Sequence, residues 1–188
     1  MARLILASSS PRRQEILKSL RASFEIITSN ADESVDCNMP PEEIVMTLAE
    51  RKAQTVAKEN HDAFVIGADT IVVYNDRILG KPADRDDAKQ MLMMLSGNTH
   101  AVFTGTCILH GNDKEIFYEK TEVSFWKLTE AEIERYIRTG EPLDKAGSYG
   151  IQGYGAILVK SIHGDFYSVV GLPVAKMYRA LKKMGYPT

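Results

Sequence analysis

The sequence predicts a mixed-sheet α/β or α+β fold. Helical and strand patterns alternate along the chain, which is typical of proteins that cover a sheet with helices. Hairpin signals are too frequent for a purely parallel sheet. No internal repeat and no linker-like run of Gly, Pro or Ser interrupts the 188 residues. We therefore expect residues 1–188 to form a single domain, or one domain built in two lobes.

The N-terminal part predicts two strands and two helices. Arg3–Ala7 is a short apolar run, and Ser10-Pro11 then supplies an N-cap and a proline suited to the first turn of a helix. Phe24–Thr28 has the composition of a strand. Pro40–Glu59 predicts a long helix, because its apolar residues form one stripe at helical spacing. These residues are Ile44, Val45, Leu48, Ala49, Ala53 and Val56.

The middle of the chain predicts hairpins around one helix. Phe64–Tyr74 is strand-like, and Asn75-Asp76 turns the chain toward Arg77–Leu79. Asp84–Leu95 is expected to be a helix that Gly97 stops. Residues 99–128 are rich in β-branched and aromatic residues and predict antiparallel strands with a turn at Gly111–Asp113.

The C-terminal part predicts two further helices. Thr129 and Glu132 form a capping-box pair that opens a helix ending near Gly140. Two strands are expected around Ser161–Asp165, and Gly171–Met184 predicts an amphipathic terminal helix.

Composition restricts the classes of function. Hydrophobic residues make up 44% and charged residues 26% of the chain, as in globular domains. The 23 basic and 25 acidic residues give a net charge of −2, which argues against non-specific binding to nucleic acid or to an anionic membrane. An anionic ligand must therefore be bound by a local cluster of cations.

Cysteine usage and hydropathy indicate a cytoplasmic protein. Cys37 and Cys107 lack the spacing of a redox pair or a zinc site, so we expect two reduced thiols. The sequence contains no apolar run long enough to span a membrane. Its N-terminal arginines and Pro11 do not fit a signal peptide.

Three segments combine charged side chains with an unusual context. Ser8–Arg13 lies between a predicted strand and a predicted helix, where backbone N–H groups, serine hydroxyls and Arg12 and Arg13 could bind phosphate. An N-capped helix with solvated arginines is the alternative. Lys52 falls within the apolar stripe of its helix and must snorkel, pair or point into a polar cleft.

The third segment is Gly67-Ala68-Asp69-Thr70, which lies inside an apolar strand. A carboxylate there is costly unless a cation accompanies it, which makes Asp69 a candidate general base or metal ligand. A buried Asp that caps a loop is the alternative. The predicted hairpin would bring Lys81 back toward Asp69.

Two weaker signals remain. Residues 144–153 are rich in glycine and contain Gln152, whose amide can read a base edge; an ordinary glycine-rich loop is the alternative. Asp32, Glu33 and Asp36 could hold a divalent ion or form a solvated loop. The four histidines have no metal spacing.

Together these motifs resemble the Maf family. The resemblance is carried by Ser-x-Ser-Pro-Arg-Arg at 8–13, Glu33, Lys52, Gly-Ala-Asp-Thr at 67–70, Gly-Lys-Pro at 80–82 and Asp-Lys-Ala-Gly-x-Tyr-Gly-Ile-Gln-Gly at 144–153. Residues 120–123 and 170–173 extend it to almost the whole chain. Members are nucleoside triphosphate pyrophosphatases, historically described as septum formation inhibitors. The resemblance implies a fold related to inosine triphosphate pyrophosphatases, with a cleft between two lobes.

The resemblance also implies roles for residues. Asp69 would accept the proton of the attacking water. Phosphate would be bound by Ser8, Ser10, Arg12, Arg13, Lys52 and Lys81. A divalent cation, magnesium or manganese, would bind Glu33 and Asp69. Arg12, Thr70 and Gln152 resemble the branch that acts on dTTP and UTP rather than on 7-methyl-GTP. A nucleotide-binding regulator of cell division is the alternative function, and the alternatives of a monomer and a homodimer stay open.

Overall fold

The computed structural model describes residues 2–36 and 39–187 and divides the chain into two compact units. Unit 1 contains Met1–Asp69, Thr104–Glu119 and Gly171–Thr188. Unit 2 contains Thr70–Phe103 and Lys120–Val170. Cys37 lies outside the described residues, whereas Cys107 is a buried free thiol. The cleft and the single domain predicted from the sequence stay predictions.

The described residues form a mixed sheet, as predicted. The strands are β1 (Arg3–Leu6), β2 (Glu25–Ile26), β3 (Ala63–Tyr74), β4 (Arg77–Leu79), β5 (Thr99–His110), β6 (Asp113–Phe125) and β7 (Val159–His163). Their order is β2-β1-β3-β5-β6-β7, and β4 pairs with β3. β1 is parallel to β2 and β3, whereas β3–β4 and β6–β7 are antiparallel.

The helices also follow the prediction closely. The α-helices are α1 (Pro11–Lys18), α2 (Pro41–Ala57), α3 (Arg85–Leu95), α4 (Glu130–Arg138), α5 (Phe166–Val170) and α6 (Val174–Lys183). Three 3₁₀ helices lie between α4 and β7: η1 (Glu141–Asp144), η2 (Ala146–Ser148) and η3 (Gly153–Leu158). No helix of the described residues has both the length and the apolar character needed to cross a membrane.

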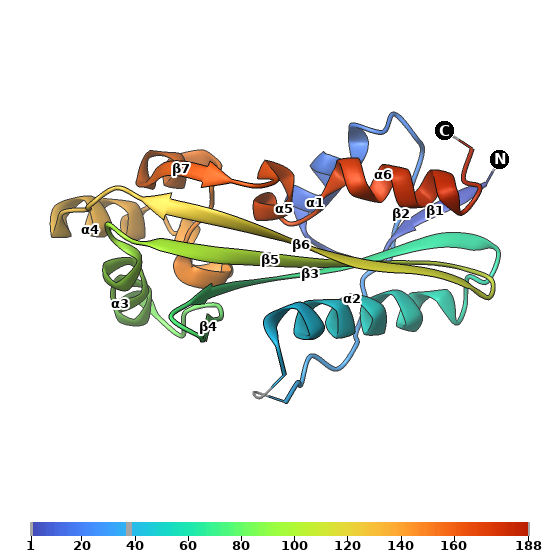
Figure 1. The fold of residues 1–188 in the computed structure, drawn as a ribbon, viewed down its shortest axis with the longest axis horizontal. Helices are drawn as coiled ribbons and strands as arrows, with labels where there is room; N and C mark the ends of the chain where they lie inside the picture. Colours follow the sequence, from blue (N-terminus) through green and yellow to red (C-terminus); the bar gives the residue numbers. More distant parts are fainter. Residues whose placement is uncertain (1, 37–38, 188) are drawn as a thin grey trace. The chain divides into compact units, whose positions relative to one another are not determined.

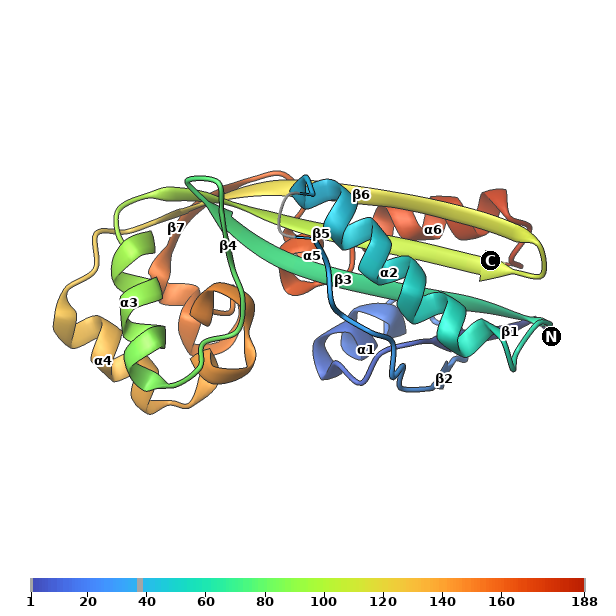
Figure 2. The same cartoon turned by 90° about the horizontal axis from the view of Figure 1, so that it is seen from below.

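In unit 1, α2 covers one face of the strands and α6 covers the opposite face (Figure 1). The buried residues of α2 are the six of the predicted apolar stripe. Two strand glycines let α2 approach closely. A Cβ on Gly67 would lie 2.2 Å from the carbonyl oxygen of Ala49, and one on Gly105 would lie 2.2 Å from that of Val45. Seen from below, α2 lies in front of these strands (Figure 2).

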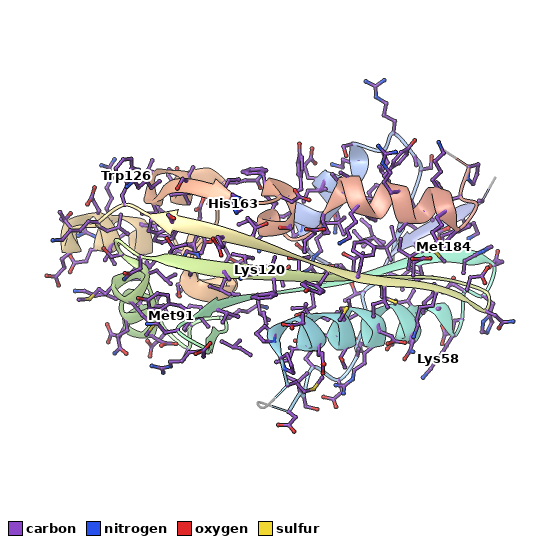
Figure 3. The ribbon with its side chains drawn as sticks, in the orientation of Figure 1. Lys58, Met91, Lys120, Trp126, His163 and Met184 are labelled. Carbon is purple, nitrogen blue, oxygen red and sulfur yellow. The ribbon has the colours of Figure 1, made fainter. Side chains whose placement is uncertain are left out.

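Unit 2 has a separate apolar core. Side chains from β3, β5, β6, α3, α4 and the segment after α4 form it, including Leu92, Phe125, Tyr136, Tyr149 and Leu158. α3 contacts α4, η1 and η2. Met91 on α3 and Trp126 after β6 are labelled in Figure 3. The predicted capping box at Thr129 and Glu132 is present at the start of α4.

The prediction of two strands around Ser161–Asp165 is wrong for the second strand. β7 ends at His163, and Gly164 then has a φ of +135°. The Asp165 carboxylate accepts a hydrogen bond of 2.7 Å from the backbone N–H of Tyr167, which caps the start of α5. Phe166 and Tyr167 favour strands by composition, but the cap and the glycine favour a helix here.

Candidate active site

The carboxyl end of β1 and the middle of its parallel neighbour β3 position candidate residues in unit 1. Leu6 of β1 pairs with Ile66 of β3, and the N–H of Ala7 donates to the carbonyl of Ile66 at 2.8 Å. Ser8 comes just after the end of β1, and Asp69 lies three residues beyond Ile66. In open α/β sheets, ligands bind outside the carboxyl ends of strands, and Ser8 lies outside the carboxyl end of β1.

Lys52 of α2 connects two carboxylates. Its Nζ lies 2.6 Å from Oδ1 of Asp69 and 2.8 Å from Oε1 of Glu33. The side chains of Lys52 and Asp69 are each only 14% exposed, whereas that of Glu33 is 67% exposed. Of the three options predicted for Lys52, pairing is therefore the one realised. A partly buried ion pair contributes little net stability because of its desolvation cost, so stability gives only a weak reason for this group of charges.

Arg13 is fixed beside this pair. Its Nε donates to the carbonyl of Gly171 at 2.8 Å, and its Nη1 donates to Oγ of Ser8 at 3.4 Å. Burial lowers the pKa of Arg13, while the negative charges of Asp69 and Glu33 oppose that decrease. Arginine stays protonated at any physiological pH, so Arg13 adds a fixed positive charge to the group.

The start of α1 supplies backbone donors. Pro11 occupies the first helical turn and Ser10 the N-cap position, both as predicted, yet within the described chain the Ser10 side chain makes no capping hydrogen bond. The buried Ser8 hydroxyl accepts instead from the N–H of Ser10 at 3.2 Å. The first turn contains no acidic residue, and Arg12 lies in it half-buried. This end of the helix therefore suits an anion.

The carboxylates fit a magnesium or manganese ion, but only together with a substrate. Among the described residues, no group of three His, Cys, Asp or Glu side chains could hold a metal by itself. Asp32 does not join Glu33, because its carboxylate accepts from the N–H and hydroxyl of Ser34 at 2.9 and 2.6 Å. Asp69 and Glu33 supply two hard oxygen donors, and Mg²⁺ is commonly bound by one or two carboxylates plus substrate phosphates.

The remaining predicted residues, Thr70, Lys81 and Gln152, belong to unit 2. Pairing of β3 with β4 confirms the predicted hairpin, and Lys81 follows β4 as an exposed residue. The N–H of Gly147 donates to the carbonyl of Gly80 at 3.0 Å, which joins the Gly-Lys-Pro segment to the glycine-rich segment. The approach of Lys81 to Asp69 stays a prediction.

Three groups whose contacts the sequence pattern does not predict hold these segments. The Gly171 carbonyl binds Arg13, the Tyr136 hydroxyl binds the N–H of Gly150, and the Glu141 carboxylate binds the N–H groups of Tyr154 and Gly155. Each of these hydrogen bonds involves the backbone on one side. Backbone groups carry no residue-specific signal, so the sequence pattern could not reveal them.

The chain is similar to known proteins over nearly its whole length. A family model described as Maf-like protein matches residues 3–184. The chain belongs to the Maf family. Maf relatives named dTTP/UTP pyrophosphatase occur in Bacillus cereus (strain B4264) and Bacillus cytotoxicus. They are 55% and 54% identical over 183 residues, which cover 97% of this chain and 96% of each relative.

The fold of this Maf protein is also found in a solved structure of another protein. The Ham1 protein of Staphylococcus aureus superimposes with a TM-score of 0.50 at 13% sequence identity, covering 84% of this chain and 79% of that one. This similarity confirms the mixed-sheet α/β class.

Proposed function

We propose that this protein hydrolyses a nucleoside triphosphate to the monophosphate and pyrophosphate, with dTTP and UTP as its substrates. The observation that supports this most directly is the group of Lys52, Asp69 and Glu33 with Arg13 beside it. It combines a carboxylate able to accept a proton with cations able to bind phosphate. The name shared by the Bacillus relatives supports the choice of nucleotides.

In this reaction a water molecule attacks the α-phosphorus and pyrophosphate leaves. Asp69 accepts the proton of the water. Lys52 holds the Asp69 carboxylate in place through their 2.6 Å contact. Phosphoryl transfer depends mainly on positioning and on neutralising negative charge. Arg12, Arg13, Lys52 and Lys81 provide the positive charge, and Ser8 and Ser10 provide neutral donors.

A magnesium or manganese ion is proposed to bind Glu33 and Asp69, where it would supply further positive charge to the phosphate oxygens. Glu33 suits this role because its side chain is largely exposed while it still contacts Lys52. Removal of divalent cations with EDTA should abolish turnover, and added Mg²⁺ or Mn²⁺ should restore it.

Base selection is assigned to Arg12, Thr70 and Gln152. A uracil or thymine edge presents two carbonyl oxygens and one N–H, and the Gln152 amide can donate to one and accept from the other. A 7-methylguanine base carries a positive charge that a carboxylate would serve better, and none of these three residues has one. We expect a specificity constant (kcat/KM) for dTTP and UTP well above that for 7-methyl-GTP, since mismatched hydrogen bonds can cost several orders of magnitude.

Product analysis tests the reaction. Purified protein with Mg²⁺ should release pyrophosphate and a monophosphate from dTTP. Release of orthophosphate instead would contradict the proposal. The alternative, a nucleotide-binding regulator of cell division, predicts binding of dTTP without turnover under the same conditions.

The proposal also includes the setting of the protein. A net charge of −2 gives no general attraction for nucleic acid, and a nucleoside triphosphate is the proposed partner. The cytoplasm is the proposed location. Sedimentation of the purified chain distinguishes a monomer from a homodimer.

A further inference from the structure

We infer that Tyr136 and Glu141 are positioning residues for base selection: they bind the backbone on both sides of Gln152 and so fix where its amide meets the base. The inference rests on the proposed function, because it concerns the selectivity assigned to Gln152. All of its contacts lie within unit 2.

The first contact precedes Gln152. The Tyr136 hydroxyl accepts a hydrogen bond of 3.0 Å from the N–H of Gly150, two residues before Gln152. Tyr136 comes from α4 and is 3% exposed, packed in the apolar core of unit 2. A hydroxyl on a side chain so deeply buried needs a polar partner. The ring is therefore fixed by packing, and its hydroxyl fixes the backbone of the segment.

The second contact follows Gln152. The Glu141 carboxylate accepts from the N–H of Tyr154 at 3.1 Å through Oε1 and from the N–H of Gly155 at 3.3 Å through Oε2. Hydrogen bonds to an ionised acceptor are stronger than neutral ones. Glu141 is itself held in place, since the Nζ of Lys145 donates to its backbone carbonyl at 2.6 Å.

Two glycines are needed for these contacts. A Cβ on Gly153 would lie 2.4 Å from Oε1 of Glu141, and Gly153 has a φ of +67° that favours glycine. A Cβ on Gly155 would lie 2.8 Å from the Tyr136 hydroxyl. The glycines after Gln152 thus leave room for the two side chains that bind the backbone.

The two positioning residues also interact with each other. Burial raises the pKa of Tyr136 above its usual range, and the charge of Glu141 and a hydrogen bond with it act in the same direction. The Tyr136 hydroxyl therefore stays protonated and joins both contacts into one network. The Gln152 side chain is exposed, so its position depends on the backbone that this network holds. A hydrogen bond that selects a base depends on such placement.

The test uses Tyr136→Phe and Glu141→Gln in the full chain. Phe keeps the ring and removes the acceptor, whereas Gln keeps the shape and retains one accepting oxygen instead of two. We expect the ratio of kcat/KM for dTTP to that for dGTP to fall about tenfold in each variant, the effect of one lost hydrogen bond. The change should come from KM, with kcat for dTTP within about twofold of wild type. Tyr167→Phe and Glu130→Gln, both exposed residues of unit 2, are the matched controls and should keep the wild-type ratio.

A second background separates positioning from general stability. In Gln152→Ala, adding Tyr136→Phe should not lower the dTTP to dGTP ratio any further. A further fall of equal size, or a single variant whose melting temperature drops while its ratio stays unchanged, would overturn the inference.

Binding measurements keep the inference distinct from the proposed function. Dissociation constants for α,β-imido-dUTP and α,β-imido-dGTP should show the same tenfold loss of selectivity in both variants. Wild-type protein that shows this binding selectivity but produces no pyrophosphate would contradict the proposed reaction and leave the positioning role supported. Selectivity of binding that is equal in wild type and variants would contradict the positioning role alone.

Discussion

The candidate site in unit 1 and the glycine-rich segment in unit 2 are held by different kinds of polar contact. In unit 1, charged side chains contact each other directly: Lys52 lies between Asp69 and Glu33, with Arg13 alongside. In unit 2, polar side chains such as Tyr136 and Glu141 contact backbone N–H groups of a glycine-rich segment. The first arrangement suits chemistry on phosphate, and the second suits fixing a chain segment in place. Substitutions within the charged group of unit 1 should therefore reduce turnover, whereas those at the backbone contacts of unit 2 should change selectivity or stability.

The largest expected effect is that of Asp69→Asn. The substitution keeps the size of the side chain and removes the proton acceptor, so kcat for dTTP should fall about 100-fold or more. Steady-state kinetics with pyrophosphate detection measures it. Asp62→Asn is the matched control in unit 1, because Asp62 is 72% exposed and pairs with Arg3. Near-wild-type turnover in Asp69→Asn would assign Asp69 a structural role and remove the basis of the comparison.

Lys52→Met should have the next largest effect. The variant removes the cation that contacts both carboxylates and keeps the apolar length of the side chain. We expect kcat/KM for dTTP to fall roughly 10- to 100-fold, the range for a lost hydrogen bond to a charged group. Lys58→Met, at the exposed end of the same helix (Figure 3), should behave like wild type. If both variants lose activity equally, the loss reflects the overall positive charge of α2 and not the contacts of Lys52 with Asp69 and Glu33.

The same contrast explains what the sequence could predict. Lys52 and Asp69 stand out because each places a charge inside an apolar pattern, and a charge there needs a partner. Their pairing is the structural result of that requirement. The carboxylates of Asp32 and Glu33, adjacent in sequence, look equivalent there, yet only Glu33 contacts Lys52 while Asp32 binds Ser34. Loop geometry decides between them, and composition does not encode it.

Unit 2 was harder to predict for a physical reason. Tyr136 has the position of an ordinary core residue, and Glu141 follows a glycine in a polar segment. Their hydrogen bonds to the segment around Gln152 are with backbone N–H groups, which every residue except proline offers. The glycines of residues 144–153 indicate that another group approaches the backbone closely, but they do not identify that group. The second strand predicted near Ser161–Asp165 fails similarly, because the cap at Asp165 outweighs the strand composition of the next two residues.

The glycine-rich segment of unit 2 also contacts a titratable side chain, His100. Its Nε2 lies 2.7 Å from the Tyr149 hydroxyl, and burial lowers its pKa to about 4. An unfolded His titrates near 6.5, so between these values the unfolded state binds the proton and the folded state does not. Stability is therefore full above the unfolded pKa and is lost as the pH falls toward 4. From pH 7.5 to pH 5 the loss should be roughly 2 kcal/mol.

Urea unfolding at the two pH values measures that loss. His100→Gln keeps a hydrogen-bonding amide and does not titrate, so its free energy of unfolding should decrease by roughly 2 kcal/mol less than that of wild type over the same interval. His163→Gln, at an exposed position of β7, should follow wild type. Equal pH dependence in wild type and His100→Gln would show that His100 is protonated in the folded state without penalty.

The smallest effect compares two helix starts, one in each unit. Thr129 begins α4 with a capping box: its hydroxyl accepts from the N–H of Glu132 at 3.3 Å, and the Glu132 carboxylate accepts from the N–H of Thr129 at 2.7 Å. Ser10 holds the same position at α1 without a capping hydrogen bond.

Thr129→Ala should therefore lower the free energy of unfolding by about 1 kcal/mol and leave kcat/KM for dTTP unchanged. Ser10→Ala should change stability by only about 0.3 kcal/mol but raise KM for dTTP severalfold, because its hydroxyl is assigned to the phosphate. Urea unfolding and steady-state kinetics on both variants decide the matter. A stability loss in Ser10→Ala as large as that in Thr129→Ala, with KM unchanged, would show that Ser10 serves the fold and that the helix starts of the two units do not differ in use.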